Sequence, residues 1–238
     1  MKLNKLAFVM GLLLASSALA ADSGGNSVYI DQTNADNSNV SITQTGSNNQ
    51  IGDLGLTSPF LIDGNAMNLT IDQDGMSNSI LGNFIGGDST MNILQSGNSN
   101  STNFNMGNFG TNSGTLNLSV TGSNNSTALN IGTTNNSSNY NYDLTINGGN
   151  LGGNSNSVIS NINSTYTKNT ILLTGSGNTL TTTQIGAGGT SLVDGHKITT
   201  NVIGSNNDMT ILQNGTTNPN NVTVNVTGSN TTTAITQH

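Results

Sequence analysis

Residues 39–52 read NVSITQTGSNNQIG. Val40, Ile42 and Gln44 occupy every second position and are separated by Ser and Thr, after which comes a Gly-Ser-Asn-Asn cluster. Strict alternation over this length is typical of a strand with one buried face, and a cluster of Gly, Ser and Asn is typical of a turn. The stretch therefore predicts a β-strand followed by a tight corner.

The unusual member of the buried face is Gln44, because its amide lies on the same face as Val40 and Ile42. A buried polar group without partners costs about 1–3 kcal/mol. A copy of the same amide stacked above and below would supply those partners, as in the amide ladders of cross-β structures. The unit therefore predicts its own repetition along the chain.

Units of a strand followed by a glycine recur throughout the sequence. They are VSITQTG (40–46), LTIDQDG (69–75), MNILQSG (91–97), LNLSVTG (116–122), YDLTING (142–148), TILLTG (170–175), TTNVIG (199–204) and VTVNVTG (222–228). The spacing of their glycines falls within the roughly 20–50 residues that separate successive turns of solenoid proteins. A second strand-like segment follows most of these corners, so each repeat reads as strand, corner, strand and loop.

We therefore predict an all-β fold, a β-solenoid of about eight strand-turn-strand repeats with two facing parallel sheets and an amyloid-like core. The expected corner residues are Gly46, Gly75, Gly97, Gly122, Gly175, Gly204 and Gly228, with Asn49, Asn78, Asn100, Asn125, Asn178 and Asn207 three positions after a corner glycine. The expected ladder residues are Gln32, Gln44, Gln73, Gln95, Gln184, Gln213 and Gln237. We expect these corner and ladder residues to connect successive repeats, and we treat them together as a structural site.

The composition agrees with a strand-rich array. Only 6% of the residues are charged and 4% are aromatic, and Cys and Trp are absent. Soluble globular domains usually contain about 25% charged residues. Good helix formers are scarce, whereas Asn, Ser, Thr and Gly favour turns and strands. Low charge with abundant Asn and Gly is also found in disordered chains, but regular strand patterning favours a folded repeat array.

Residues 1–20 have the features of a secretory signal peptide. Lys2 and Lys5 precede a short apolar run, and Ala18-Leu19-Ala20 forms an Ala-x-Ala cleavage site. We divide the rest into a short segment, 21–37, with a partial repeat, and a repeat array, 38–238. The mature chain is expected to be secreted and extracellular, without a membrane span, because no later stretch approaches the roughly 20 apolar residues that spanning requires.

The remaining charges exclude several function classes. Without the leader, Lys168 and Lys197 stand against eleven acidic residues, a net charge of −9 (2 − 11). Nucleic acids require clustered Lys or Arg, so we expect no nucleic-acid partner. Catalysis requires titratable groups held against each other, and His196 and His238 have no clustered partners in the sequence; we expect no enzyme and no cofactor. Asp72-Gln73-Asp74-Gly75 lacks the other ligands of a calcium loop, so no metal site is expected.

The first repeats resemble those of the curlin family, the subunits of bacterial curli amyloid fibres. The curlin unit is Ser-x5-Gln-x-Gly-x2-Asn-x-Ala-x3-Gln, and Ser38, Gln44, Gly46 and Asn49 stand at the corresponding spacings. The same pattern recurs at Gln73, Gly75 and Asn78 and at Gln95, Gly97 and Asn100. From Val120 onward the first strand lacks this glutamine, and the repeats are longer than those of curlins.

The resemblance implies a homopolymer that assembles with other curlin-like subunits, either a nucleator or a major subunit. It also implies export through an outer-membrane pore with a periplasmic chaperone. Curlins carry a Gly/Asn-rich export segment before their repeats, and only residues 21–26 occupy that place here. The expected function is thus that of a secreted subunit of curli-like fibres in the biofilm matrix, which serves adhesion and aggregation.

Two other functions compete with this expectation. A monomeric or capped β-helical adhesin would bind glycans or abiotic surfaces through its loops. An ice- or crystal-binding protein would use rows of threonine such as Thr181 to Thr183 and Thr231 to Thr233. Solenoids that stay monomeric require polar capping repeats, whereas this chain starts within a strand pattern at Val28 and is still in the motif at Gln237.

Overall fold

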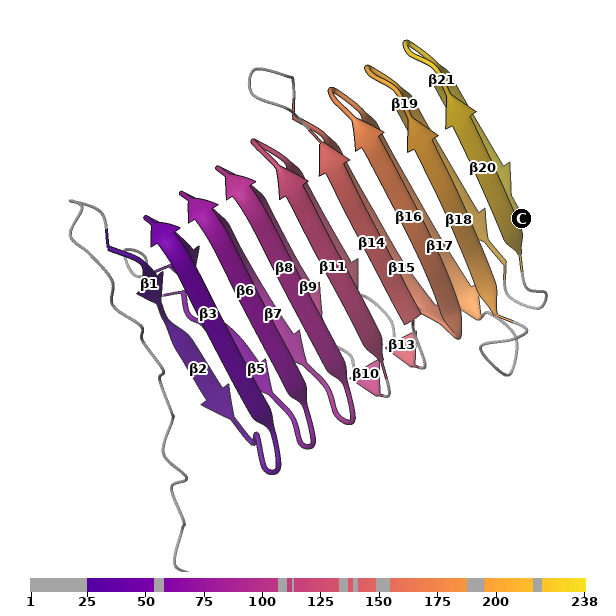
Figure 1. Cartoon of the computed structure of the whole chain (residues 1–238). Coiled ribbons are helices and arrows are strands. Elements are labelled where there is room, and N and C mark those ends of the chain that lie inside the picture. Colours follow the sequence, from indigo (N-terminus) through magenta and orange to yellow (C-terminus); the bar gives the residue numbers. More distant parts are fainter. Residues whose placement is uncertain are drawn as a thin grey trace, which may run out of the picture.

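The computed structural model describes residues 25–53, 58–106, 111–112, 114–132, 137–138, 141–148, 155–187, 195–215 and 220–238. The signal peptide predicted at 1–20 lies outside the described residues. The described elements are β-strands, and they form two broad parallel sheets that face each other (Figure 1).

Among the described residues, the first sheet has eight strands, and each pairs in parallel with the next of them along the chain. They are β3 (Asn39–Ser47), β6 (Asn68–Met76), β8 (Thr90–Asn98), β11 (Thr115–Gly122), β14 (Asn141–Gly148), β16 (Thr167–Gly175), β18 (His196–Ile203) and β20 (Asn221–Thr227). These strands coincide with the eight units that the sequence predicts.

The second sheet contains the strands that follow the corners. They are β1 (Ser27–Val28), β2 (Ile30–Thr33), β4 (Gln50–Ile51), β5 (Phe60–Asp63), β7 (Ser79–Ile85), β9 (Ser101–Met106), β12 (Ser126–Ile131), β15 (Ser157–Thr165), β17 (Thr179–Ala187), β19 (Asp208–Asn214) and β21 (Thr232–Gln237). β1 with β2, and β4 with β5, each form one level of this sheet, because β4 pairs with β1 and β7 while β5 pairs with β2 and β7. A small sheet joins β10 (Thr111–Asn112) to β13 (Ser137–Ser138).

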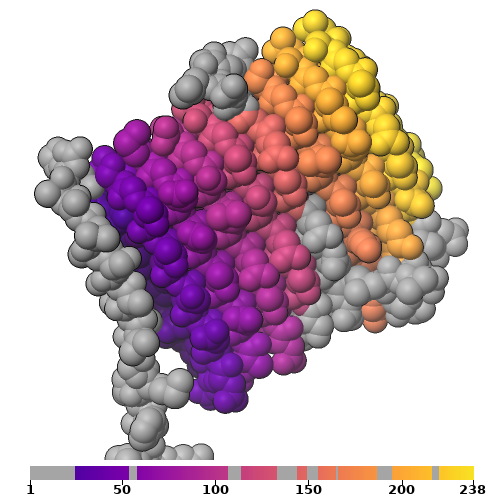
Figure 2. Space-filling model, viewed as in Figure 1, coloured from indigo at the N-terminus to yellow at the C-terminus, as the bar shows by residue number. Residues whose placement is uncertain are grey.

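The chain alternates between the two sheets and advances by one strand at each return. It forms a β-solenoid of about 7 turns, which confirms the predicted fold class of about eight repeats. Successive turns appear as successive bands of colour along the column, from indigo to yellow (Figure 2). Since parallel strands lie about 4.8 Å apart, the eight described strands of the first sheet span roughly 34 Å from β3 to β20.

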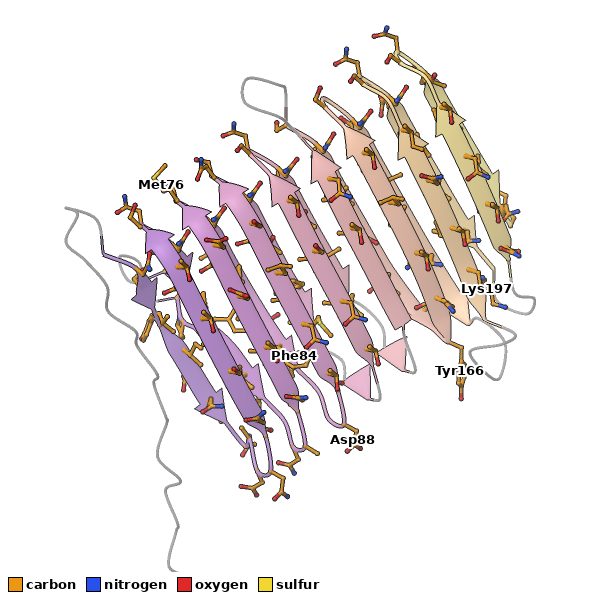
Figure 3. All side chains as sticks on the ribbon, in the orientation of Figure 1. Met76, Phe84, Asp88, Tyr166 and Lys197 are labelled. Carbon is orange, nitrogen blue, oxygen red and sulfur yellow. The ribbon has the colours of Figure 1, made fainter. Side chains whose placement is uncertain are left out.

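The core lies between the sheets and consists of columns of equivalent side chains. In β6, Leu69, Ile71 and Gln73 are buried while the residues between them face outward, as the alternation in the sequence predicts. Strand register places Ile42, Ile71 and Ile93 in one column. Figure 3 shows this regular arrangement of side chains along the strands. Each turn therefore buries its apolar face mainly against the turns before and after it.

Candidate functional site

Asparagine side chains connect the corners that follow the strands of the first sheet. The backbone N–H and Nδ2 of Asn78 both donate to Oδ1 of Asn49 at 3.1 Å. Nδ2 of Asn78 also donates to the carbonyl of Gly97 on the next turn at 2.8 Å. Asn100 repeats the arrangement with Asn78 and with Gly122. One amide thus bonds to the turn before it and to the turn after it.

The asparagine ladder is continuous along the column. It contains the six predicted asparagines and one more, in the order Asn49, Asn78, Asn100, Asn125, Asn156, Asn178 and Asn207. Asn26 begins it, because its Oδ1 accepts the N–H of Asn49 at 3.0 Å. Thr231 ends it, donating its N–H to Oδ1 of Asn207 at 3.0 Å.

Asn156 and Asn26 are the ladder members that the glycine-based pattern misses. In the corner after Gly148 an insertion separates the glycine from its asparagine, so the three-residue spacing fails. A different signal identifies both residues, namely an asparagine followed directly by the small polar residue that begins a strand of the second sheet. Asn26-Ser27 and Asn156-Ser157 share this signal with Asn100-Ser101.

The corner glycines allow the neighbouring turns to approach this closely. Gly97 has a φ of 112°, and a Cβ at this position would overlap the carbonyl oxygen of Gly122. A side chain would therefore meet both backbone strain and a steric clash. The other predicted corner glycines also have positive φ, namely Gly46, Gly75, Gly122, Gly175, Gly204 and Gly228.

Three glutamines form a ladder inside the first sheet near its N-terminal end. Nε2 of Gln44 donates to Oε1 of Gln73 at 2.7 Å, and Nε2 of Gln73 donates to Oε1 of Gln95 at 2.9 Å. The last amide, that of Gln95, donates across the core to Oγ1 of Thr102 at 2.7 Å. Val120 occupies the next place in the column. The ladder thus ends on a hydroxyl group where the apolar column begins.

A second glutamine ladder lies in the other sheet, near the C-terminal end. Nε2 of Gln184 donates to Oε1 of Gln213 at 2.8 Å, and Nε2 of Gln213 donates to Oε1 of Gln237 at 3.3 Å. Asn169 in the opposite sheet donates to Oε1 of Gln184 at 2.7 Å. Gln32 joins neither ladder, since its register partner is Ile62. The predicted glutamines therefore do not form one column.

A buried histidine, His196, begins β18 and lies at the end of that strand opposite to its glycine corner. Nδ1 of His196 accepts the N–H of Asn220 at 3.1 Å, and Nε2 lies 3.4 Å from the carbonyl oxygen of Gly215. This geometry fits a neutral ring with its proton on Nε2. Burial lowers the pKa of His196, and the hydrogen bond to Gly215 offsets part of that effect. The nearby cations are Lys197 and, on the adjacent strand, its register partner Lys168.

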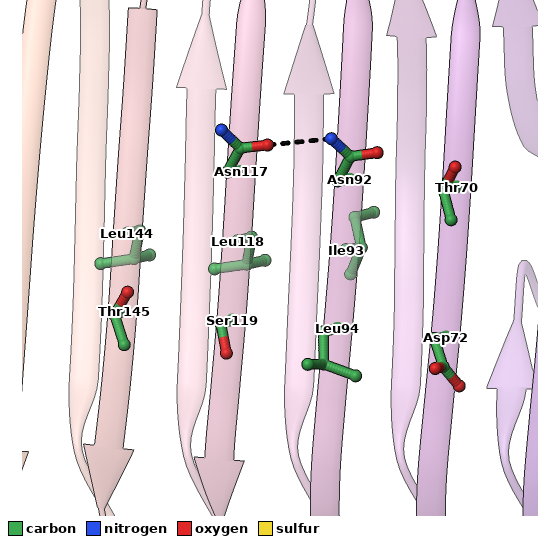
Figure 4. A pocket seen from close by; sticks show the side chains of 10 residues that line it. All are labelled: Thr70, Asp72, Asn92, Ile93, Leu94, Asn117, Leu118, Ser119, Leu144 and Thr145. Carbon is green, nitrogen blue, oxygen red and sulfur yellow. Dashed lines mark hydrogen bonds between the residues drawn. The ribbon is translucent and has the colours of Figure 1, made fainter.

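A hollow on the outer face of the first sheet includes the side chain of Leu94 (Figure 4). Leu94 is 41% exposed there, between Asp72 and Ser119 on the neighbouring strands. Nδ2 of Asn92 donates to Oδ1 of Asn117 at 2.9 Å beside it. Among the described residues, no three His, Cys, Asp or Glu side chains gather as a metal site would require.

The strands at the two ends of the column have unpaired edges. In the described part of the chain, β3 pairs only with β6, β20 only with β18, and β21 only with β19. The inward residues of β20 are Val222, Val224 and Val226, and those of β3 are Val40, Ile42 and Gln44. The carbonyls of Gln44 and Gly46 in β3 accept from Nδ2 of Asn26. The other backbone N–H and C=O groups along such edges are of the kind that pairs with another strand.

Comparison with known proteins identifies no relative: no family model, curated protein or solved structure matches this chain. Within the described ranges there is also no helix of the length and apolarity needed to cross a bilayer. The chemistry of the site therefore rests on the ladders, the corners and the end strands alone.

Replacement of a ladder asparagine tests the role of the corners. Asn100→Ala leaves the carbonyl of Gly122 and the N–H of Asn125 without their partners in a buried corner. We expect the free energy of unfolding, measured by urea denaturation, to fall by about 3 kcal/mol or more. The control is Asn92→Ala on the outer face, for which we expect a change within about 1 kcal/mol. Equal losses in the two variants would contradict the assignment.

The first glutamine ladder predicts strongly non-additive substitutions. Gln73→Val alone removes the acceptor of Gln44 on the next turn, leaving it only the carbonyl of Ser27, and removes the donor to Gln95, at a cost of about 2–3 kcal/mol. The triple variant Q44V/Q73V/Q95V removes the ladder amides together and extends the apolar column that starts at Val120. We expect the triple variant to be at least as stable as the single one in urea denaturation. Additive losses would contradict the ladder.

His196 predicts loss of stability in mild acid. Its pKa in the folded state is lowered from 6.5, so the unfolded chain takes up the proton first as the pH falls. The free energy of unfolding should therefore decrease as the pH drops below about 6.5, and His196→Asn should flatten this dependence between roughly pH 7.5 and 5. His238→Asn, the same substitution at an exposed position, is the matched control. An identical slope in His196→Asn and the wild type would contradict the prediction.

Proposed function

We propose that this protein is a structural subunit that assembles through its end strands into extracellular cross-β fibres. The observation that carries the proposal is that β3, β20 and β21 are each unpaired on one side in the described part of the chain and alternate inward and outward side chains as the interior strands do. Inside the column every turn is bonded on both sides. A second copy that continues the column would give the end strands the same environment.

Three of the end strands, β3, β20 and β21, lack the features that normally prevent edge-to-edge association, whereas β2 carries the exposed Asp31. Natural edge strands are often blocked by charged side chains, prolines, bulges or a covering loop. β3, β20 and β21 contain neither a charged residue nor a proline. Segments of high β-propensity and low charge are the type that stacks in cross-β assemblies. The sequence of these edges thus favours addition of another strand.

Two of the three inward positions match between the two ends, and the third would place Val226 on Gln44. If β20 of one copy pairs with β3 of the next in the same register, Val222 lies on Val40 and Val224 lies on Ile42. These contacts continue columns that are mainly apolar inside the subunit, as in the pair Ile198 and Val222, although Asn169 and Thr200 also belong to them. Association would bury side chains that are half-buried at the end of the single column, and burial of apolar surface contributes about 25 cal/mol per Å².

The wider biological role follows from the same proposal. Resemblance to curlins supports a fibre of the curli type in a biofilm matrix, where it serves adhesion and aggregation. The signal peptide features of residues 1–20 support secretion, with an outer-membrane pore and a periplasmic chaperone as export partners. The subunit would polymerise with itself and with other curlin-like subunits.

Seeded growth of the purified mature chain tests the proposal. We expect a lag phase that preformed fibres abolish, and fibre diffraction with a reflection at about 4.8 Å from the stacked strands. A chain that stays monomeric and does not respond to seeds at micromolar concentration would contradict the proposal. If such a monomer bound glycans or abiotic surfaces, the adhesin alternative would replace it.

A matched pair of variants locates the growing surface. Ile235→Lys places a charge on the inner face of β21, where a further copy would bury it, and should prevent seeded growth. Ile159→Lys places the same charge on the outer face of β15, where Ile159 is 40% exposed, and should permit growth. Growth of Ile235→Lys at the wild-type rate would exclude β21 as part of the growing end.

A further inference from the structure

The two sheets differ in their number of levels. In the described part of the chain, the second sheet runs through nine successive strands from β1 to β21, with β2 and β5 completing its first two levels, whereas the first sheet has eight. Along the chain β1 and β2 precede β3, and β21 follows β20. Both ends of the solenoid therefore finish with a half-turn in the second sheet.

This surplus half-turn creates a conflict when copies stack with the same polarity. If β20 pairs with β3 of the next copy, one strand of the second sheet fits beside that junction, but both β21 and the incoming β1–β2 segment compete for the position. If both stay, one strand is missing between β20 and the next β3. The gap would separate them by two strand spacings, roughly 9.6 Å, and leave two edges unpaired in the interior of the fibre.

The two competing segments are similar in sequence and in register. Residues 27–33 read SVYIDQT and residues 232–238 read TTAITQH. Their inward residues are Val28, Ile30 and Gln32 in the first, and Thr233, Ile235 and Gln237 in the second. Val28 pairs with Ile51, Ile30 with Phe60 and Gln32 with Ile62. The terminal strand of another copy can thus occupy the same positions on β4 and β5.

The polar contacts of the N-terminal half-turn also have counterparts in the C-terminal one. Nε2 of Gln44 donates to the carbonyl of Ser27 at 3.2 Å, and Thr232 would present its carbonyl at that position. Oδ1 of Asn26 accepts the N–H of Asn49, and the hydroxyl of Thr231 would stand in the same place. Exchange therefore retains an acceptor for each of these two donors.

The N-terminal half-turn is the less regular of the two. It is divided at Tyr29 into a strand of 2 residues and a strand of 4, and Asp31, Gln32 and Thr33 are exposed. β21 is a single strand of 6 residues, and Gln237 bonds to both Gln213 and the carbonyl of Asn221 at 3.3 Å. Displacement of β1–β2 therefore disrupts fewer regular contacts than displacement of β21.

We propose that residues 26–33 form an internal cap, which β21 of a neighbouring copy displaces and replaces register for register when the column elongates. This inference rests on the proposed fibre and adds which strands meet at the junction between two copies. The cap covers the second-sheet edge of the free subunit, so growth requires an exchange rather than simple end-to-end contact. The partner recognised by β4 and β5 is a second copy of this chain.

A reversible disulfide tests the exchange, because the chain contains no cysteine of its own. Asp31 and Leu61 are register partners with outward side chains, so D31C/L61C can bond β2 to β5 across the strand spacing. Under oxidising conditions we expect growth on wild-type seeds to stop after at most one added subunit. Reduction should restore growth. A melting curve of the oxidised monomer verifies that the variant is folded.

The matched control bonds two strands that never separate in the proposed exchange. N105C/N130C joins register partners in β9 and β12, in the same outward column of the second sheet, and should elongate when oxidised. If oxidised D31C/L61C elongated as the reduced form does while wild-type fibres grew normally, the exchange would be overturned and the fibre retained. Failure of the wild type to form any fibre would overturn both proposals.

A mixing experiment distinguishes exchange from simple stacking without relying on the locked variant. Fibres grown under reduction from T236C and L61C chains and then oxidised should give a disulfide-linked dimer on a non-reducing gel. Thr236 occupies in β21 the place that Asp31 occupies on Leu61, which is why this pair should meet. A dimer from T236C with D31C, and none from T236C with L61C, would instead show that the cap stays in place.

Discussion

The asparagine amide at each corner is the interaction on which the rest of the column depends. Its oxygen accepts bonds from the following turn, and its nitrogen bonds to the preceding asparagine and to the next glycine carbonyl, as Asn78 shows. A single turn of a solenoid cannot bury its own apolar face and needs a neighbour in fixed register. A shift of one residue would turn every core side chain outward. The ladder fixes that register at a point where the glycines let the backbones meet.

The core combines amides and aliphatic groups in the same columns, and this mixture restricts where the amides can end. A glutamine inside the column requires a partner at both ends of its amide, because a buried unpaired donor or acceptor is costly. The first ladder ends on the hydroxyl of Thr102, and the second receives a bond from Asn169. The ladders therefore determine which turns can be neighbours in the column, and they also stabilise it.

The ends of the column have the same chemistry as its interior, and this connects stability with function. Strands with no charge at the edge and with matching inward residues are available for a further copy. The half-turn formed by residues 26–33 covers one such edge with a segment like β21. In the free subunit, residues 26–33 occupy the place that β21 of another copy takes in the fibre. Assembly is then an exchange of these two equivalent segments.

The strands, the corners and the solenoid could be predicted from the sequence. Alternation of apolar residues and the glycines of the corners are local patterns, and they recur in each repeat. The sequence also located six corner asparagines, whose spacing from the glycine is constant. Tertiary structure alone decided that Gln44 and Gln184 belong to different sheets, that Asn156 completes the ladder, and that His196 is buried. Loop insertions change the spacing along the chain, whereas contact between turns depends on the stacking register, which no local pattern contains.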